Sequence, residues 1–302
     1  MKYYGGIEAG GTKFVCVVAS GPDDILAQER LPTTSPQETI AKTIEFFRPF
    51  VESKQLDTIG IASFGPVDIN PKSNTYGFIT TTPKPGWAQT DLLGSIKRAL
   101  GVKCSFDTDV NAAALGEYYW VPENRKLDPL LYITVGTGIG VGYIVNGKPL
   151  HGLIHPEGGH AFIPHDRTID PFPGVCPYHG DCMEGLASGP AMAARWGQPA
   201  ETLEDDHPGW DLEAKYLAYM ISNLILNFSP QRVELGGGVP QHVGLIEKIR
   251  LNVQQQINGY VRSAKVLENI DQYIVPPTLG NRAGVMGAIA LGILQKGNVD
   301  DD

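Results

Sequence analysis

The chain has 302 residues, with 24 Lys and Arg against 33 Asp and Glu and a net charge of −9. This acidic balance excludes nucleic acid and anionic membrane surfaces as partners, because both bind to basic protein surfaces. No run of eighteen apolar residues is present, which excludes a transmembrane helix. The first residues, Met1–Gly5, lack the apolar core of a secretory signal, so we expect a cytoplasmic protein.

Glycine is the unusual feature of the composition, with 36 residues where the roughly 7% of an average protein would give far fewer. The glycines gather at residues 5–11, 136–142 and 236–238, each next to a strand-like apolar run. Strand patterns on both sides of the first two clusters predict two β-hairpins. Two similar hairpin units about 125 residues apart indicate two related halves.

Helices are predicted between these units. Ser35-Pro36-Gln37-Glu38 is a capping box, and apolar residues at helical spacing follow it, which predicts a helix to about Ser53. Similar patterns predict helices over residues 92–100, 111–119, 211–228 and 283–294.

Strands that alternate with helices indicate an α/β fold. We expect two α/β domains with an active-site cleft between them. The first is residues 1–116, with a terminal helix over 283–296 packed back on it. The second is residues 117–282, with a metal-binding loop over 155–185, and residues 297–302 are expected to form a frayed tail.

The first two glycine clusters are candidate phosphate-binding turns. Glu8-Ala9-Gly10-Gly11-Thr12-Lys13 and Gly136-Thr137-Gly138-Ile139-Gly140 allow backbone N–H groups to face an anion. Either turn alone is equally consistent with an ordinary hairpin, but two such turns and a third cluster favour phosphate binding. Neither turn has the P-loop pattern or the strand-then-helix context of a dinucleotide fingerprint.

Carboxylates follow a strand-like run over residues 102–106. Asp107 and Asp109 lie between this run and an Ala-rich helix pattern, which is where α/β sheets place catalytic groups. Beside a phosphate site, such a carboxylate accepts the proton of an attacking hydroxyl. The alternative is that Asp109 or Asn111 only caps the helix.

His160 and the sequence Cys176-Pro177-Tyr178-His179-Gly180-Asp181-Cys182 supply four N and S ligands, which suits a closed tetrahedral zinc site. A Cys176–Cys182 disulfide and unrelated surface positions are the alternatives. The nearby His155 and His165 leave the identity of the fourth ligand open.

The segment from Thr80 to Trp87 is polar and rich in turn residues. It is either a loop that presents hydroxyl and indole groups to a polyol or an ordinary surface loop with Trp87 turned inward.

Taken in order, these motifs resemble those of the ROK (repressor, ORF, kinase) sugar kinases, and most closely their bacterial fructokinase branch, which contains zinc. Residues 8–13 and 136–140 resemble the two phosphate motifs of the actin/hexokinase-like (ribonuclease H-like) ATPase fold, and residues 236–240 resemble its adenosine motif. Residues 107–111 resemble the catalytic segment, in which the second acid, here Asp109, is the general base.

The resemblance implies a kinase that transfers phosphate from ATP to the 6-hydroxyl of a hexose, with D-fructose as the expected substrate, Mg²⁺ and structural Zn²⁺ as cofactors, and a homodimer. We expect backbone N–H groups of both turns to face the phosphates. The implied nucleotide contacts are Gly10, Gly11, Thr12, Lys13, Gly136, Thr137, Gly138, Pro190, Gly236, Gly237, Gly238, Val239 and Pro240. The implied sugar contacts are Thr81, Trp87, Thr108, Asp109, Glu157, His160 and Glu184. The implied zinc ligands are His160, Cys176, His179 and Cys182, and Glu8 would reach Mg²⁺ through water.

Three positions depart from the family pattern. Glu8 replaces an Asp, Thr108 replaces an Asn of the glucokinase members, and His179 stands in a zinc motif that more often has three cysteines. Another hexose or an N-acetylhexosamine is the alternative substrate, and a non-catalytic sugar sensor or a zinc-dependent hydrolase is the alternative function. A hydrolase would need an open metal position, which four protein ligands do not leave.

Overall fold

The structure is a computed structural model that describes residues 2–297, and the chain forms two compact units. Unit 1 comprises the described residues up to Lys126, the segment Gly147–Pro156 and the residues from Thr278 onward. Unit 2 comprises Leu127–Asn146 and Glu157–Pro277. Each unit is an α/β structure built around a β-sheet.

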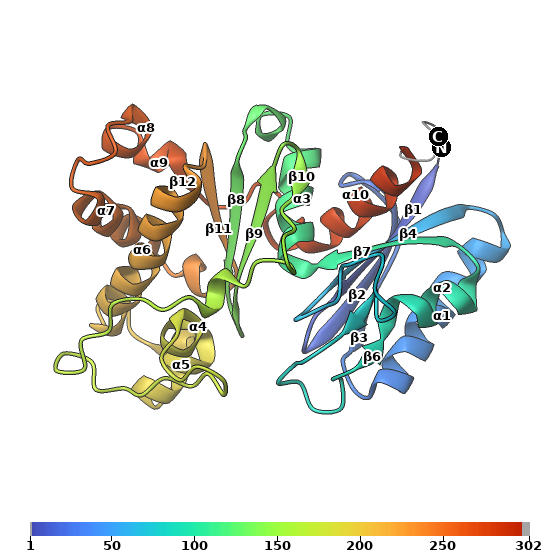
Figure 1. Ribbon diagram of the computed structural model, residues 1–302, viewed down its shortest axis with the longest axis horizontal. Coiled ribbons are helices and arrows are strands. Elements are labelled where there is room, and N and C mark those ends of the chain that lie inside the picture. The colour runs from blue at the N-terminus through green and yellow to red at the C-terminus, as the bar shows by residue number, and fades with distance from the viewer. Residues whose placement is uncertain (1, 298–302) are drawn as a thin grey trace. The chain divides into compact units, whose positions relative to one another are not determined.

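Unit 1 is organised around a five-stranded sheet in the order β3-β2-β1-β4-β7 (Figure 1). The first three strands are antiparallel neighbours, whereas β4 and β7 run parallel to β1. The strands are β1 (Tyr3–Ala9), β2 (Lys13–Gly21), β3 (Asp24–Pro32), β4 (Leu56–Ser63) and β7 (Lys103–Thr108). A separate pair, β5 (Phe78–Ile79) and β6 (Thr90–Asp91), and the short β10 (Lys148–Pro149) complete the strands of this unit.

Helices cover both faces of this sheet. A Cβ on Gly5 of β1 would meet Phe47 of helix α1 (Pro36–Glu52), while one on Gly6 would meet Val285 and Ile289 of helix α10 (Ala283–Gly297). Because neighbouring strand residues point to opposite faces, α1 and α10 lie on opposite sides. Helix α2 (Leu92–Leu100) packs beside α1, and α3 (Asp109–Trp120) packs beside α10. Two 3₁₀ turns, η1 (Asn124–Lys126) and η5 (Gly280–Arg282), also belong to this unit.

In unit 2 the strands β9, β8, β11 and β12 are neighbours in that order. Strands β8 and β9 form a hairpin, and β11 runs parallel to both β8 and β12. The strands are β8 (Leu130–Val135), β9 (Ile139–Val145), β11 (Arg232–Gly236) and β12 (Ile274–Val275). The helices are α4 (Met183–Ala187), α5 (Gly189–Trp196), α6 (Gly209–Phe228), α7 (Leu245–Ile257), α8 (Ala264–Leu267) and α9 (Ile270–Tyr273). The 3₁₀ turns are η2 (Gly158–His160), η3 (Ala200–Thr202) and η4 (Val239–Gln241).

The predicted hairpins and helices are confirmed. The hairpins are β1–β2 and β8–β9. Ser35 caps α1 by accepting a hydrogen bond from the Glu38 N–H, and Gly101 ends α2 in the left-handed conformation. The tail expected over residues 297–302 is described only at Gly297, where α10 ends, and the rest lies outside the described residues. Among residues 2–297, no helix combines the length and the apolar character needed to cross a bilayer.

Close packing of α10 explains part of the glycine content. A Cβ on Gly60 of β4 would lie 1.8 Å from the Ala288 carbonyl oxygen, and one on Gly287 would lie 1.7 Å from the Ala112 carbonyl oxygen. Real Cβ atoms do not approach other atoms so closely, so β4, α3 and α10 meet through residues with little or no side chain. The sequence pattern predicts anion-binding turns for the three glycine clusters. It does not indicate that Gly60 and Gly287 allow α10 to pack closely against β4 and α3.

We expect Gly60→Ala to destabilise the protein by at least about 1–3 kcal/mol, because the added methyl group forces the α10 backbone away from β4. Urea denaturation would measure the free energy of unfolding. Gly152→Ala is the matched control, since its Cβ would have no neighbour nearer than 3.8 Å. Equal unfolding midpoints for wild type and Gly60→Ala would contradict the close-packing argument.

Candidate active site

The first predicted phosphate turn and the predicted base leave the unit 1 sheet at the same edge. Strand register aligns Ala9 of β1 with Ser63 of β4, and Ser63 with Thr108 of β7. Two strand spacings place Ala9 and Thr108 about 10 Å apart. The turn that follows Ala9 and the acid that follows Thr108, Asp109, are therefore neighbours at the carboxyl ends of parallel strands, where α/β sheets bind ligands.

The turn between β1 and β2 keeps two backbone donors available. The Gly10 N–H donates to the Lys13 carbonyl oxygen at 3.0 Å, so this donor is used within the turn and does not face a phosphate as we expected. The N–H groups of Gly11 and Thr12 have no partner among residues 2–297. A Cβ on Gly11 would have no neighbour within 4 Å, so this part of the turn is open to a ligand.

Glu8 lies on β1 just before this turn. Its carboxylate lies against α10, where a Cβ on Gly284 would be 2.6 Å from Oε1. Burial raises the pKa of Glu8, while the charges of Lys13 and Arg30 act in the opposite direction. A buried carboxylate of this kind is stabilised by a nearby cation.

Thr108, and neither Asp109 nor Asn111, caps helix α3. The Thr108 hydroxyl accepts the Asn111 N–H at 3.1 Å, and its side chain is buried. The hydroxyl therefore serves the helix, and the predicted sugar contact of Thr108 stays a prediction. Asp109 is the first residue of the helix, and its Oδ1 accepts the Val110 N–H at 2.8 Å. The helix therefore fixes the position of Asp109, which is partly exposed.

Trp87 is a core residue. Its side chain is fully buried, its indole N–H donates to the Thr34 carbonyl oxygen at 2.8 Å, and its ring packs against Phe14 and Phe64. The expected sugar contact of Trp87 is therefore contradicted, and the inward alternative holds. Thr81 from the same loop is exposed, so its predicted sugar contact stays a prediction.

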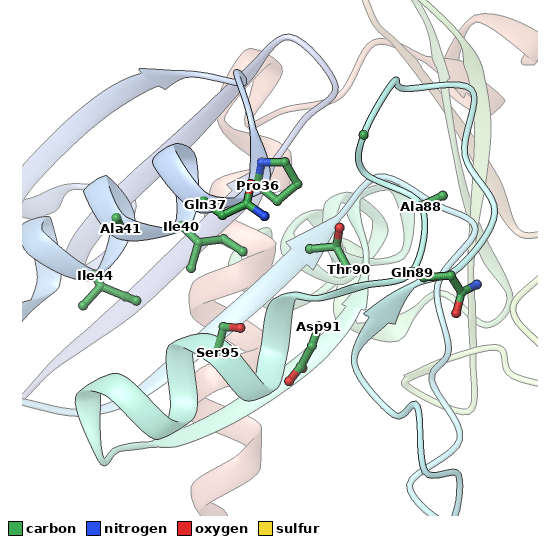
Figure 2. Close-up of a pocket in the computed structure, with 11 residues that line it drawn as sticks. Pro36, Gln37, Ile40, Ala41, Ile44, Ala88, Gln89, Thr90, Asp91 and Ser95 are labelled. Atoms are coloured by element: carbon green, nitrogen blue, oxygen red, sulfur yellow. The ribbon is translucent and has the colours of Figure 1, made fainter.

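A pocket in unit 1 lies away from these motifs. It has a volume of about 490 Å³ and lies between α1 and the segment that leads into α2, with Ile40 and Ile44 on one side and Thr90 and Ser95 on the other (Figure 2). None of the predicted site residues lines it, so it contributes nothing to the candidate site.

The second phosphate turn in unit 2 resembles the first. The Gly136 N–H donates to the Gly138 carbonyl oxygen at 2.9 Å, so it too is used within the turn, and this corrects the expectation that it faces a phosphate. The N–H groups of Thr137 and Gly138 have no partner in the described part of the chain. The Gly136 carbonyl oxygen accepts the Gly189 N–H at 2.8 Å, which joins the turn to the start of α5 next to the exposed Pro190.

The third cluster follows β11. Gly237 has a φ of +95°, and a Cβ there would lie 2.2 Å from the Val135 carbonyl oxygen, so both the conformation and the close approach to β8 require glycine. A Cβ on Gly238 would have no neighbour within 4 Å, which leaves this residue open before Val239 and Pro240 in η4. Their predicted adenosine contacts stay predictions.

His160, Cys176, His179 and Cys182 place one ligand atom each within 4.8 Å of one another. The Nδ1–Sγ distances are 3.7 Å for His160–Cys176, 3.6 Å for His179–Cys176 and 3.5 Å for His160–Cys182. Zinc bond lengths in a regular tetrahedron give an N–S separation of about 3.6 Å, so these atoms have the spacing of a zinc-ligand set.

The two alternatives to this ligand set are a Cys176–Cys182 disulfide and a ligand role for His155 or His165. Both cysteines are thiols, so they form no disulfide. The His155 Nε2 accepts the Val67 N–H within unit 1, and the His165 ring nitrogens bind Asp181 and the Asp170 carbonyl oxygen.

Glu184 connects this Cys/His cluster to the second phosphate turn. Its Oε1 lies 3.9 Å from His160 Nε2, the ring nitrogen that faces away from the cluster, and its Oε2 accepts the Ile139 N–H at 2.9 Å. A Cβ on Gly138 would lie 2.7 Å from Oε2, so a side chain at this position would displace the Glu184 carboxylate. Burial and the Glu184 charge raise the pKa of the neighbouring Glu157 to about 7. Two carboxylates and an imidazole thus lie together, as a polyol site requires.

A buried network that the sequence analysis missed supports the same loop. The Asp170 carboxylate accepts hydrogen bonds from Arg195 Nε at 3.2 Å and from the Tyr216 hydroxyl at 2.7 Å. These bonds hold the loop between His160 and Cys176 to α5 and α6. The three residues are far apart in sequence and form no motif, so no sequence signal identifies them.

Solved structures share this fold. A ROK hexokinase from Thermus thermophilus superposes with a TM-score of 0.75 at 23% identity, over 98% of this chain and 99% of that one. A ROK glucokinase from Streptomyces griseus, solved with glucose and AMPPNP, gives 0.73 at 22% identity over 97% and 99%. The expected hexokinase-like α/β ATPase fold is confirmed.

Relatives match over nearly the whole chain. A putative fructokinase from Bacillus subtilis (strain 168) is 48% identical over 95% of this chain and 94% of its own. A fructokinase from Zymomonas mobilis is 42% identical over 97% of both chains, and a glucokinase from Halalkalibacterium halodurans is 25% identical over 95% and 93%. The model of the ROK family matches residues 4–294. The chain belongs to the ROK family.

Proposed function

We propose that the protein is an ATP-dependent fructokinase that phosphorylates D-fructose at the 6-hydroxyl. The choice of fructose as substrate rests on a difference in sequence identity between two groups of relatives. Relatives named fructokinase are 38–48% identical over at least 92% of the chain, whereas those named glucokinase or N-acetyl-D-glucosamine kinase are 25–26% identical. The cytoplasmic location and the homodimer that the family resemblance implies stay predictions.

Asp109 is the proposed general base. It would accept the proton of the sugar 6-hydroxyl as the oxygen attacks the γ-phosphate. A carboxylate is too weak a base to deprotonate a free alcohol, so the proton moves as the O–P bond forms. Position and electrostatic stabilisation then account for most of the lowering of the barrier. Its fixed place at the start of α3 supports this role.

The available N–H groups of both turns are the proposed phosphate ligands. They are Gly11 and Thr12 in unit 1 and Thr137 and Gly138 in unit 2. Mg²⁺ bound to the phosphates would neutralise the charge that develops on the transferred group. The buried Glu8 carboxylate fits a hydrated cation at this position.

Glu157 and Glu184 are the proposed sugar ligands. Both carboxylates accept hydrogen bonds from hydroxyl groups, and Glu184 is held by the Ile139 N–H of the phosphate hairpin. Fixed acceptors discriminate between hexoses. A sugar without a hydroxyl group at the matching position leaves a buried acceptor without a hydrogen-bond donor.

His160, Cys176, His179 and Cys182 are the proposed zinc ligands, since their spacing fits tetrahedral coordination. Four protein ligands close the site, so zinc would fix the loop that carries His160 and take no part in the reaction. A zinc-dependent hydrolase is disfavoured for the same reason.

We expect fructose to give the highest kcat/KM in a coupled ATP assay against fructose, glucose, mannose and N-acetylglucosamine. Measurable sugar binding without turnover of any of these hexoses would instead support the sugar sensor. A higher kcat/KM for glucose would overturn the assignment of fructose.

We expect Asp109→Asn to lower kcat by about 10²–10⁴-fold, because the amide cannot accept the hydroxyl proton. The same assay measures it, with the melting temperature as a check on folding. Asp23→Asn, at an exposed position in the turn between β2 and β3, is the control and should keep wild-type activity. A folded Asp109→Asn protein with near wild-type kcat would refute the base assignment.

We expect protein purified without chelator to contain one zinc per chain by elemental analysis. Cys182→Ala should abolish zinc binding, because three ligands no longer close the tetrahedron. Cys104→Ala, at a buried cysteine outside the cluster, is the control and should retain the metal. Less than about half an equivalent of zinc in folded wild-type protein would contradict the site.

A further inference from the structure

We infer that His151 is a positioning residue for phosphoryl transfer, and that it acts through Asp107 on the turn that carries Asp109. The inference rests on the proposed kinase function and concerns a histidine that no motif includes. It is carried by one contact, in which His151 Nε2 lies 2.8 Å from Asp107 Oδ2 across 44 residues of sequence.

Asp107 contacts a residue on each side of Asp109, the Thr108 backbone and the Asn111 side chain. Its other carboxylate oxygen, Oδ1, accepts the Thr108 N–H at 2.8 Å and the Asn111 side-chain amide at 2.8 Å. Thr108 precedes Asp109, and Asn111 follows it in the first turn of α3. A shift of the Asp107 carboxylate would therefore move the residues that set the direction of the Asp109 side chain.

His151 is the group that neutralises this carboxylate. Asp107 is 2% exposed, and a buried carboxylate is costly unless it is paired. The hydrogen bond to Asp107 raises the pKa of His151, which favours the imidazolium.

The other titratable groups around Asp107 do not replace this charge. His155 accepts the Val67 N–H at Nε2, and burial lowers its pKa, so it is neutral. Burial and the Asp107 charge raise the pKa of Tyr76, so this side chain stays protonated and uncharged. Asp109 itself is acidic and adds negative charge. His151 is thus the cation that faces Asp107 among the groups that interact with it.

The same contact anchors the segment Gly147–Pro156 to unit 1. His151 holds this segment to the end of β7, and His155 holds it to Val67. Glu157, a proposed sugar ligand, follows directly in the sequence. A contact that is only structural would stabilise this segment without affecting the chemical step, and kinetics distinguishes the two roles.

The test compares His151→Ala and His151→Gln with wild type by kcat, by KM for fructose and ATP, and by melting temperature. Because misplacement of a reacting group acts on the chemical step, His151→Ala should lower kcat about tenfold and change either KM less than threefold. His151→Gln keeps a neutral donor to Asp107 but lacks the positive charge, so its kcat should lie between those of His151→Ala and wild type. His207→Gln, outside this contact, is the control and should match wild type.

The pH profile separates charge from hydrogen bonding. A raised folded-state pKa means that the ion pair is present at lower pH and is lost as the pH rises through that pKa. Wild-type kcat should therefore fall above the pKa of His151, and this fall should be absent in His151→Gln.

Each outcome tests either the positioning role of His151 or the proposed kinase function. An unchanged kcat in His151→Ala, with only a lower melting temperature, overturns the inference and leaves the kinase assignment intact. A wild-type protein that turns over no hexose overturns the proposed function and this inference with it. Unfolded His151→Ala leaves His151→Gln as the test, and a wild-type pH profile in that variant overturns the inference.

Discussion

The contact on which unit 1 depends is the close approach of α10 to β4 and α3. Ala62, Ala112 and Ala288 form a small core at this contact, and the glycines beside them bring backbone against backbone. This packing fixes α3 along the sheet, and α3 carries Asp109 at its first residue. At the other end of the same helix, Glu117 accepts the N–H groups of Thr278 and Leu279 at 3.1 and 2.7 Å. The position of the proposed base is thus set by backbone packing along the full length of one helix.

In unit 2 a chain of polar contacts joins the candidate site residues. The Cys/His cluster orients His160, His160 lies beside Glu184, and Glu184 holds the hairpin residue Ile139. A carboxylate that faces the outer nitrogen of a metal-binding histidine is the usual way to orient such a ligand. One carboxylate therefore joins the proposed zinc site, the proposed sugar site and the second phosphate turn, so a change at any of the three reaches the others.

Local signals in the sequence predicted the elements well, and contacts between distant residues account for the rest. The capping box at Ser35 and the spacing of Cys176, His179 and Cys182 depend on neighbouring residues, so they are readable without a fold. Whether Trp87 faced inward depended on Thr34 and Phe14, which no local pattern connects to it. The pairing of Asp107 with His151 is equally non-local, and nothing in the sequence pattern of residues 147–156 indicated that this segment joins unit 1.

The arrangement of charge answers a difficulty that the composition raises. A protein with a net charge of −9 repels a polyanion such as ATP unless its negative groups are neutralised near the phosphates. In unit 1, burial raises the pKa of Glu8 while the charges of Lys13 and Arg30 act against this effect, and Asp107 is paired with His151. The phosphate ligands proposed for both turns are backbone N–H groups, which attract anions without adding net charge. Asp109 lies at the same sheet edge, as the first residue of α3. Nearby cations and backbone N–H groups therefore reduce the repulsion that a triphosphate would meet at this edge.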